Sequence, residues 1–124
     1  MFTKFPKDDH ILSWTRHIKN KMMFYGLSES KIRRILKSPK RREEGIAPRT
    51  MAAMQRNDRA KKKEEIWVMY QTKRKEKNTP GRKLGLAPQV RLISAWRYPG
   101  ISKAGDAIPI PDHILADLAE VLKS

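Results

Sequence analysis

The sequence predicts one α+β domain: two N-terminal helices packed on a three- or four-stranded antiparallel sheet, with a short C-terminal helix. Two patterns support this fold class. Apolar residues recur at every third or fourth position near both ends of the chain, as on one face of a helix, and at every second position in the middle, as on one face of a strand. A chain of 124 residues buries enough surface for one core but not for two. We therefore expect residues 1–124 to form a single domain, with residues 109–124 as a helical extension.

Three segments have the spacing of amphipathic helices. The first is residues 9–25, which Gly26 is suited to end. Ser28 is a favourable cap for a second helix that stops before Pro39, and Asp112 is a favourable cap for the third. The apolar positions of the first helix, spaced by three and four residues, are Ile11, Trp14, Ile18, Met22 and Tyr25.

Three strands are predicted between the second and third helices, at residues 50–55, 65–73 and 89–98. The alternation of apolar and other residues is clearest in the segment EIWVMYQ. No helical pattern separates these strands, so antiparallel pairing is the simplest arrangement. We expect Trp67 and Trp96 in the core rather than on the surface as platforms for stacked bases.

The charge of the chain is its most unusual property. Lysines and arginines number 28 against 13 acidic residues, and the resulting net charge of +15 favours a nucleic-acid partner, RNA in preference to DNA. A membrane surface is the rival partner. The chain has neither a run of about 18 apolar residues nor the apolar segment of a signal peptide, so we expect no membrane partner and a cytoplasmic location.

Basic residues gather on the outer side of the second helix, in the run that follows it and in the two loops between the strands. A flexible basic loop suits a long polyanion better than a small phosphate compound. The residues that we expect to bind nucleic acid are Arg33, Arg34, Lys37, Arg41, Arg42, Lys61, Lys62, Lys63, Arg74, Lys75, Arg82 and Lys83.

His17 and Lys21 are candidates for chemistry, on a helical stripe that also holds His10 and Trp14. An imidazole can move a proton at neutral pH while an ammonium group stabilises the charge that develops on phosphorus, so this pair suits RNA cleavage. The alternative is structural, with His17 half-buried in the helix and Lys21 in solvent.

Arg97 and Tyr98 are the candidates in the last strand, where alternation places Arg91 and Arg97 on one face. An arginine side chain can bind a phosphate with two hydrogen bonds, and Tyr98 can donate a further hydrogen bond or stack on a base. The alternative is an ion pair across strands, in which Arg97 contacts Glu64 or Glu65.

Neither a metal nor another cofactor is expected. The three histidines are scattered, the chain has no cysteine, and Gly81 and Gly85 lack the lysine and helix that follow the glycines of a phosphate-binding loop.

The order of elements resembles that of the RelE-like and BrnT-like ribonuclease toxins of bacteria. The local matches are His17, the Gly26-Leu27-Ser28 junction, and Ile93-Ser94-Ala95 followed by Arg97. This resemblance covers residues 15–98 and implies metal-independent cleavage of RNA, often on the ribosome, together with an acidic antitoxin partner. The chain departs from the BrnT-like pattern after the last strand, where it lacks the acidic residue, arginine and tyrosine in that order.

Two hypotheses for function follow. The first is a metal-independent endoribonuclease of toxin type that binds RNA through the basic residues and cleaves it with His17, Lys21, Arg97 and Tyr98. The second is a non-catalytic basic module that binds nucleic acid or the ribosome, with an affinity that falls steeply as salt rises. Binding of duplex DNA by the second helix is a weaker third reading, because that helix is short and a sheet follows it.

Overall fold

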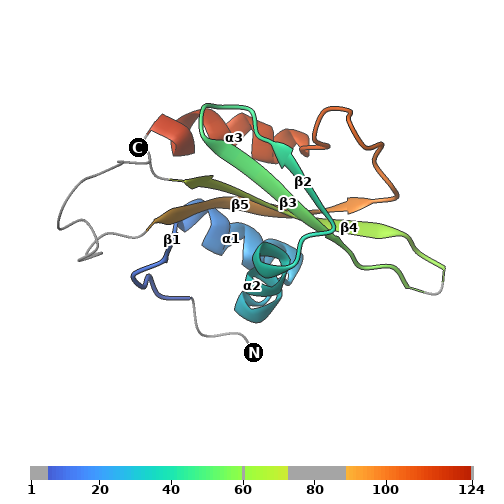
Figure 1. Cartoon of the computed structure of the whole chain (residues 1–124), viewed down its shortest axis with the longest axis horizontal. Coiled ribbons are helices and arrows are strands. Elements are labelled where there is room, and N and C mark those ends of the chain that lie inside the picture. The colour runs from blue at the N-terminus through green and yellow to red at the C-terminus, as the bar shows by residue number, and fades with distance from the viewer. Residues whose placement is uncertain (1–5, 60, 73–88, 124) are drawn as a thin grey trace.

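The computed structural model describes residues 6–59, 61–72 and 89–123. In chain order the elements are β1 (Leu12–Trp14), α1 (Arg16–Tyr25), α2 (Glu29–Lys37), β2 (Arg41–Glu44), β3 (Thr50–Arg56), β4 (Glu64–Thr72), β5 (Val90–Pro99) and α3 (Asp112–Lys123). Figure 1 shows α1 and α2 on one side of the sheet and α3 on the other. The α+β class is therefore confirmed. No helix within the described ranges is long and apolar enough to cross a membrane.

The sheet has five strands, in the order β1-β5-β4-β3-β2, and it is mixed. The predicted three- or four-stranded antiparallel sheet is wrong in both respects. Strands β2 to β5 pair antiparallel, whereas β1 pairs in parallel with β5, with Leu12 opposite Val90 and Trp14 opposite Leu92. Short hairpins fix the direction of neighbouring strands, but β1 and β5 lie far apart in the sequence, so no turn constrains their relative direction.

The first helix begins at Arg16 rather than at residue 9. The side chains of Asp8 and Asp9 accept hydrogen bonds from backbone N–H groups of the β1 segment, and Thr15 then caps α1 by accepting from the N–H of Ile18. Trp14 is buried from a strand, not from a helix. The predicted helical stripe is therefore wrong in its first half.

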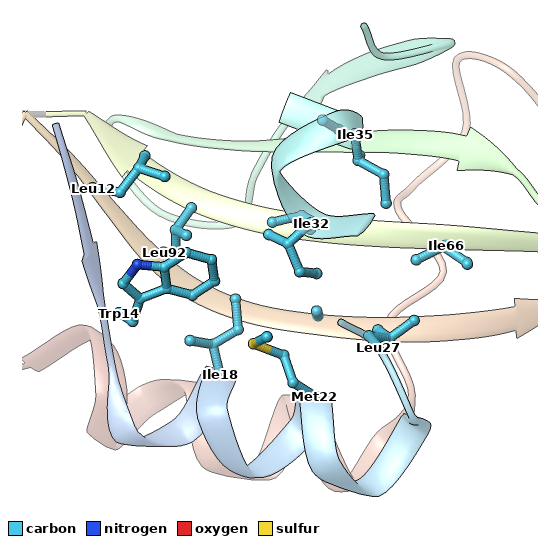
Figure 2. Packing of buried hydrophobic residues seen from close by; sticks show 12 residues of the cluster. Leu12, Trp14, Ile18, Met22, Leu27, Ile32, Ile35, Ile66 and Leu92 are labelled. Atoms are coloured by element: carbon cyan, nitrogen blue, oxygen red, sulfur yellow. The ribbon is translucent and has the colours of Figure 1, made fainter. Parts of the chain in front are cut away.

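One apolar cluster lies between α1, α2 and the sheet. Figure 2 shows Ile18 and Met22 of α1 and Ile32 and Ile35 of α2, which point into the space between the helices and the strands. Both helices are amphipathic, and burial of these side chains fixes which face of each helix stays outside.

A second apolar cluster lies under α3. Ile114 and Leu118 of this helix pack with Trp67 and Trp96, whose rings are stacked with centroids 6.3 Å apart. Neither tryptophan is exposed, so the prediction that both belong to the core is confirmed.

Strand β5 contains an irregularity that changes which side chains share a face. Met69 pairs with Ser94 and Tyr70 with Leu92, which leaves Ile93 as an extra residue. Because of this extra residue, side chains an even number of positions apart no longer share a face when the bulge lies between them. Arg91 donates to a carbonyl of α3, whereas Arg97 donates to a carbonyl at the end of α1, so the prediction that both lie on one face is wrong.

Candidate nucleic-acid interface

A hollow of about 220 Å³ lies beside the neck of the hairpin that joins β3 and β4. Figure 1 shows this hairpin on the right. Backbone hydrogen bonds continue the strand pairing past the end of the strands, from Asn57 to Glu64 and between Arg59 and Lys62. These bonds hold the hairpin side chains over the end of the sheet. The residues that line the hollow are Asn57, Arg59, Lys62, Glu64 and Arg97.

Arg97 is fixed by three contacts at the wall of this hollow. Its Nη1 lies 2.6 Å from Glu64 Oε2, its Nε donates to the carbonyl of Tyr25 at 2.8 Å, and its Nη2 donates to the carbonyl of Gly26 at 3.4 Å. Gly26 has a φ of 69° and ends α1, leaving these carbonyls without helical partners. Arg97 therefore caps α1 and forms the cross-strand ion pair with Glu64 that was the structural alternative.

Glu64 also accepts a hydrogen bond from Asn57 Nδ2, at 2.7 Å and on the same oxygen that binds Arg97. Burial acts to raise the pKa of Glu64, but the hydrogen bonds from Asn57 and Arg97, with the charges of Arg97 and Arg59, lower it below its usual value. Glu64 is thus ionised at neutral pH.

The flank of α2 that faces this region adds two more cations, Lys31 and Arg34. Gln55 of β3 fastens the end of α2 by donating to the carbonyl of Arg34 and, at 2.7 Å, to that of Ser38. Burial, then the charges of Arg34 and Arg97, lower the pKa of Lys31, and Glu64 only partly offsets them. The cations around Glu64 therefore repel one another, as expected where an anion binds.

Two of the predicted nucleic-acid-binding residues, Arg34 and Lys62, thus lie at or next to the hollow. Other predicted residues that are exposed on α2, β2 and the hairpin are Lys37, Arg42, Lys61 and Lys63. Arg42 is paired with Ala53, so it lies on the same face of the sheet as α2. The predicted residues Arg74, Lys75, Arg82 and Lys83 lie outside the described residues.

Arg33, although next to Arg34 in sequence, points away from the hollow because successive helical residues differ by about 100°. Its guanidinium contacts Glu29 at 2.9 Å and Asp9 at 3.2 Å. Backbone hydrogen bonds and Arg33 lower the pKa of Asp9 to about 2. Two carboxylates therefore neutralise Arg33, and the geometry does not support its predicted role in binding.

Arg41 is also held by partners within the protein, on the face covered by α3. Its Nη1 donates to the carbonyl and the hydroxyl of Ser102, and its guanidinium lies 5.1 Å from the centre of the Trp67 ring. The side chain is only 16% exposed. Arg41 thus joins the interior instead of extending the outer basic surface as predicted.

Glu65 is a buried carboxylate that the sequence interpretation missed. It accepts hydrogen bonds from Trp67 Nε1, from the N–H and hydroxyl of Ser102, and from Arg56 Nη1. Burial acts to raise the pKa of Glu65, but these hydrogen bonds lower it overall. The available signal was the strand alternation, which places Glu65 on the same face as Trp67.

The four predicted catalytic residues do not converge. His17 lies in the first turn of α1, whereas Arg97 binds the carbonyl of Tyr25 roughly 12 Å further along the helix axis. Lys21 is one turn from His17. Tyr98 packs against the apolar cluster under α3, on the opposite face of the sheet from Arg97. No single phosphate could contact all four.

Ser94, His17 and Asp117 are arranged in the order of a hydrolase triad. His17 Nε2 lies 2.9 Å from Ser94 Oγ, and His17 Nδ1 lies 3.9 Å from Asp117 Oδ2. A nucleophile must be within reach of its substrate, but Ser94 has no exposed surface. These contacts therefore connect α1 to β5 and α3 rather than form an active site.

The burial of His17 predicts a pH-dependent stability. Burial, and then the charge of Lys21, lower the pKa of His17, with His113 acting in the same sense and Asp117 opposing. Because the folded state disfavours the protonated form, the contribution of His17 to stability is complete above its unfolded pKa of about 6.5 and is lost as pH falls below it.

Urea unfolding above and below about pH 6.5 checks this expectation. His17→Gln, which keeps a polar group near Ser94, is expected to show a smaller loss of unfolding free energy on acidification than the original chain. His10→Gln is the matched control because His10 is exposed. Equal pH dependence in the original chain and the His17 variant would contradict the assignment.

Comparison of the chain with known protein families, curated proteins and solved structures finds no match. Within the described ranges, no group of three or more histidine, aspartate or glutamate side chains could hold a metal ion. The side chains that line the hollow offer cations, one carboxylate and one amide.

Proposed function

We propose that the protein binds RNA through the basic surface around the hollow and does not cleave it. The observation that carries this proposal is the grouping of five cations, Lys31, Arg34, Arg59, Lys62 and Arg97, around Glu64, which among the described residues is the one carboxylate that lines the hollow. The basic surface consists of Lys31, Arg34, Lys37, Arg42, Arg59 and Lys62. Phosphates along a nucleic-acid strand would relieve the repulsion among these cations and release counterions from the strand.

The shape of the surface favours RNA over duplex DNA. A recognition helix must project into the major groove. Here α2 has only nine residues, and it buries Ile32 and Ile35 against the sheet. The hollow beside it is concave, and unpaired RNA bases can turn outward and enter such a site.

The endoribonuclease hypothesis receives less support from the geometry. Its four residues lie in separate places, and Arg97 already has three partners within the protein. We therefore propose that the protein shares with the RelE-like and BrnT-like toxins an RNA partner, including ribosomal RNA, but not their cleavage of RNA.

Binding of a labelled single-stranded RNA, measured by fluorescence anisotropy over a range of salt concentrations, tests the proposal. The slope of log affinity against log salt is expected to be about −0.7 for each phosphate contacted. Combined replacement of Arg34, Arg59 and Lys62 by alanine should remove three contacts, weaken binding and reduce the magnitude of the slope by about 2. The RNA should stay intact, with or without EDTA.

A matched control removes the same charge elsewhere. Arg16, Lys103 and Lys123 are exposed and lie outside the hollow, so their combined replacement by alanine should retain most of the affinity. Equal loss in the two triple variants, or an affinity that salt does not change, would contradict an interface at this surface. RNA cleavage that His17→Ala abolishes would restore the enzymatic hypothesis.

A further inference from the structure

The hollow is lined by the ionised carboxylate of Glu64, and one oxygen of this carboxylate accepts no hydrogen bond from the described residues. Both side-chain hydrogen bonds to Glu64, from Asn57 and Arg97, go to Oε2. Among the described residues, none donates a hydrogen bond to Glu64 Oε1, although its carboxylate lines the hollow. Asn57 uses its Nδ2 for Glu64, and its Oδ1 is likewise an acceptor without a donor in the described part of the chain. Neither oxygen is among the buried polar atoms that lack a partner, so each can accept a hydrogen bond from water or from a ligand that enters the hollow.

Two cations stand at the hairpin side of the same hollow. The backbones of Arg59 and Lys62 are fixed to each other by hydrogen bonds of 2.7 and 3.0 Å. The hydrogen bonds and ion pairs formed within the described ranges involve neither side chain, so both can reach a ligand. A ligand that satisfies the hollow must offer a donor to Glu64 and an anion or carbonyl to Arg59 and Lys62.

The size of the hollow suits a small group such as one base. Pockets for drug-sized ligands occupy roughly 300–1,000 Å³, whereas this hollow measures about 220 Å³. A single base with its phosphate outside matches both the volume and the two kinds of polar group.

We infer that, if the protein binds RNA as proposed, the hollow holds one base that carries an exocyclic amino group, and that Glu64 Oε1 selects this base against uracil. Adenine, cytosine and guanine each carry an N–H₂ group that can donate to a carboxylate. The only polar N–H of the uracil ring lies between two carbonyl oxygens, which a carboxylate repels. Arg59 and Lys62 then bind the adjacent phosphate or a ring acceptor.

The variant Glu64→Gln tests this selection. Its amide oxygen can still accept from Asn57 and Arg97, while its amide N–H₂ replaces the open acceptor with a donor. The original chain should bind oligo(C) about tenfold more tightly than oligo(U), the lower part of the range for one mismatched base. Glu64→Gln should lose or reverse this ratio, and Glu120→Gln, an exposed change of equal charge on α3, should keep it.

A second measurement uses only the original chain, so it tests the inference even if Glu64→Gln does not fold. One cytosine within an oligo(U) strand should raise the affinity, and guanine should bind better than inosine in the same position because inosine lacks the amino group. Equal affinity for cytosine and uracil and for guanine and inosine, or a preference that survives in Glu64→Gln, would overturn the proposed base selection. The proposed RNA binding would still stand. No binding to any of these strands would overturn the proposed function as well.

Discussion

Replacement of Glu65 by alanine is expected to lower the free energy of unfolding by about 3–5 kcal/mol, the range observed when one partner of a buried ion pair is removed. The change leaves the guanidinium of Arg56 without its buried partner and removes the acceptor for the N–H and hydroxyl of Ser102. The indole N–H of Trp67 also loses its acceptor. Urea unfolding followed by circular dichroism measures the loss.

The loss is large against the total, because a domain of this size is stable by roughly 5–15 kcal/mol. Glu44→Ala is the matched control: Glu44 is an exposed glutamate on β2, and its removal should change stability by less than about 0.5 kcal/mol. If the two alanine variants unfolded at the same urea concentration, the carboxylate of Glu65 would not hold the strands and the segment after β5 together.

The second large effect is expected at Trp67. Trp67→Ala removes a fully buried indole that stacks on Trp96 and lies under the Arg41 guanidinium, at a cost of about 3–5 kcal/mol for the lost contacts and the cavity. Thermal and urea unfolding of the variant measure this cost.

A conservative variant separates packing from hydrogen bonding at the same position. Trp67→Phe keeps most of the ring but removes the N–H that binds Glu65, so it should cost less than Trp67→Ala. The effects of Trp67→Phe and Glu65→Ala should also be non-additive, because the two side chains share a hydrogen bond. Strict additivity would show that this hydrogen bond does not contribute to stability.

The sequence predicts the parts of the fold that rest on local patterns. The cap at Ser28 and the alternation in β4 each depend on neighbouring residues, and both are present. Asp112, predicted to cap the third helix, is instead its first residue, because the carbonyl of Pro111 accepts the first hydrogen bonds of α3. Strand β1 was missed because Ile11, Trp14 and Ile18 match a helical spacing by coincidence. That segment forms a strand because it pairs with β5, which is distant in sequence.

The candidate site was predictable only in its charge. Clustering of lysine and arginine identified Arg34 and Lys62, but spacing could not show that Arg33 is neutralised by Asp9 or that Arg41 is turned inward. The pair between Arg97 and Glu64 was foreseen as an alternative. The buried carboxylate of Glu65 was not, because burial of a glutamate depends on donors such as Ser102 that the chain supplies only after β5.

The two outer strands of the sheet are short: three residues in β1, and in β2 the four residues Arg41–Glu44, all charged. An outer strand presents unpaired N–H and C=O groups to which another chain can add, and short, charged edges oppose this addition. The charged RREE segment, in which Arg42 is exposed and Arg41 turns inward, thus also opposes the addition of another strand at the β2 edge. At the β1 edge, where Leu12 and Trp14 are buried, the shortness of the strand rather than charge limits such addition.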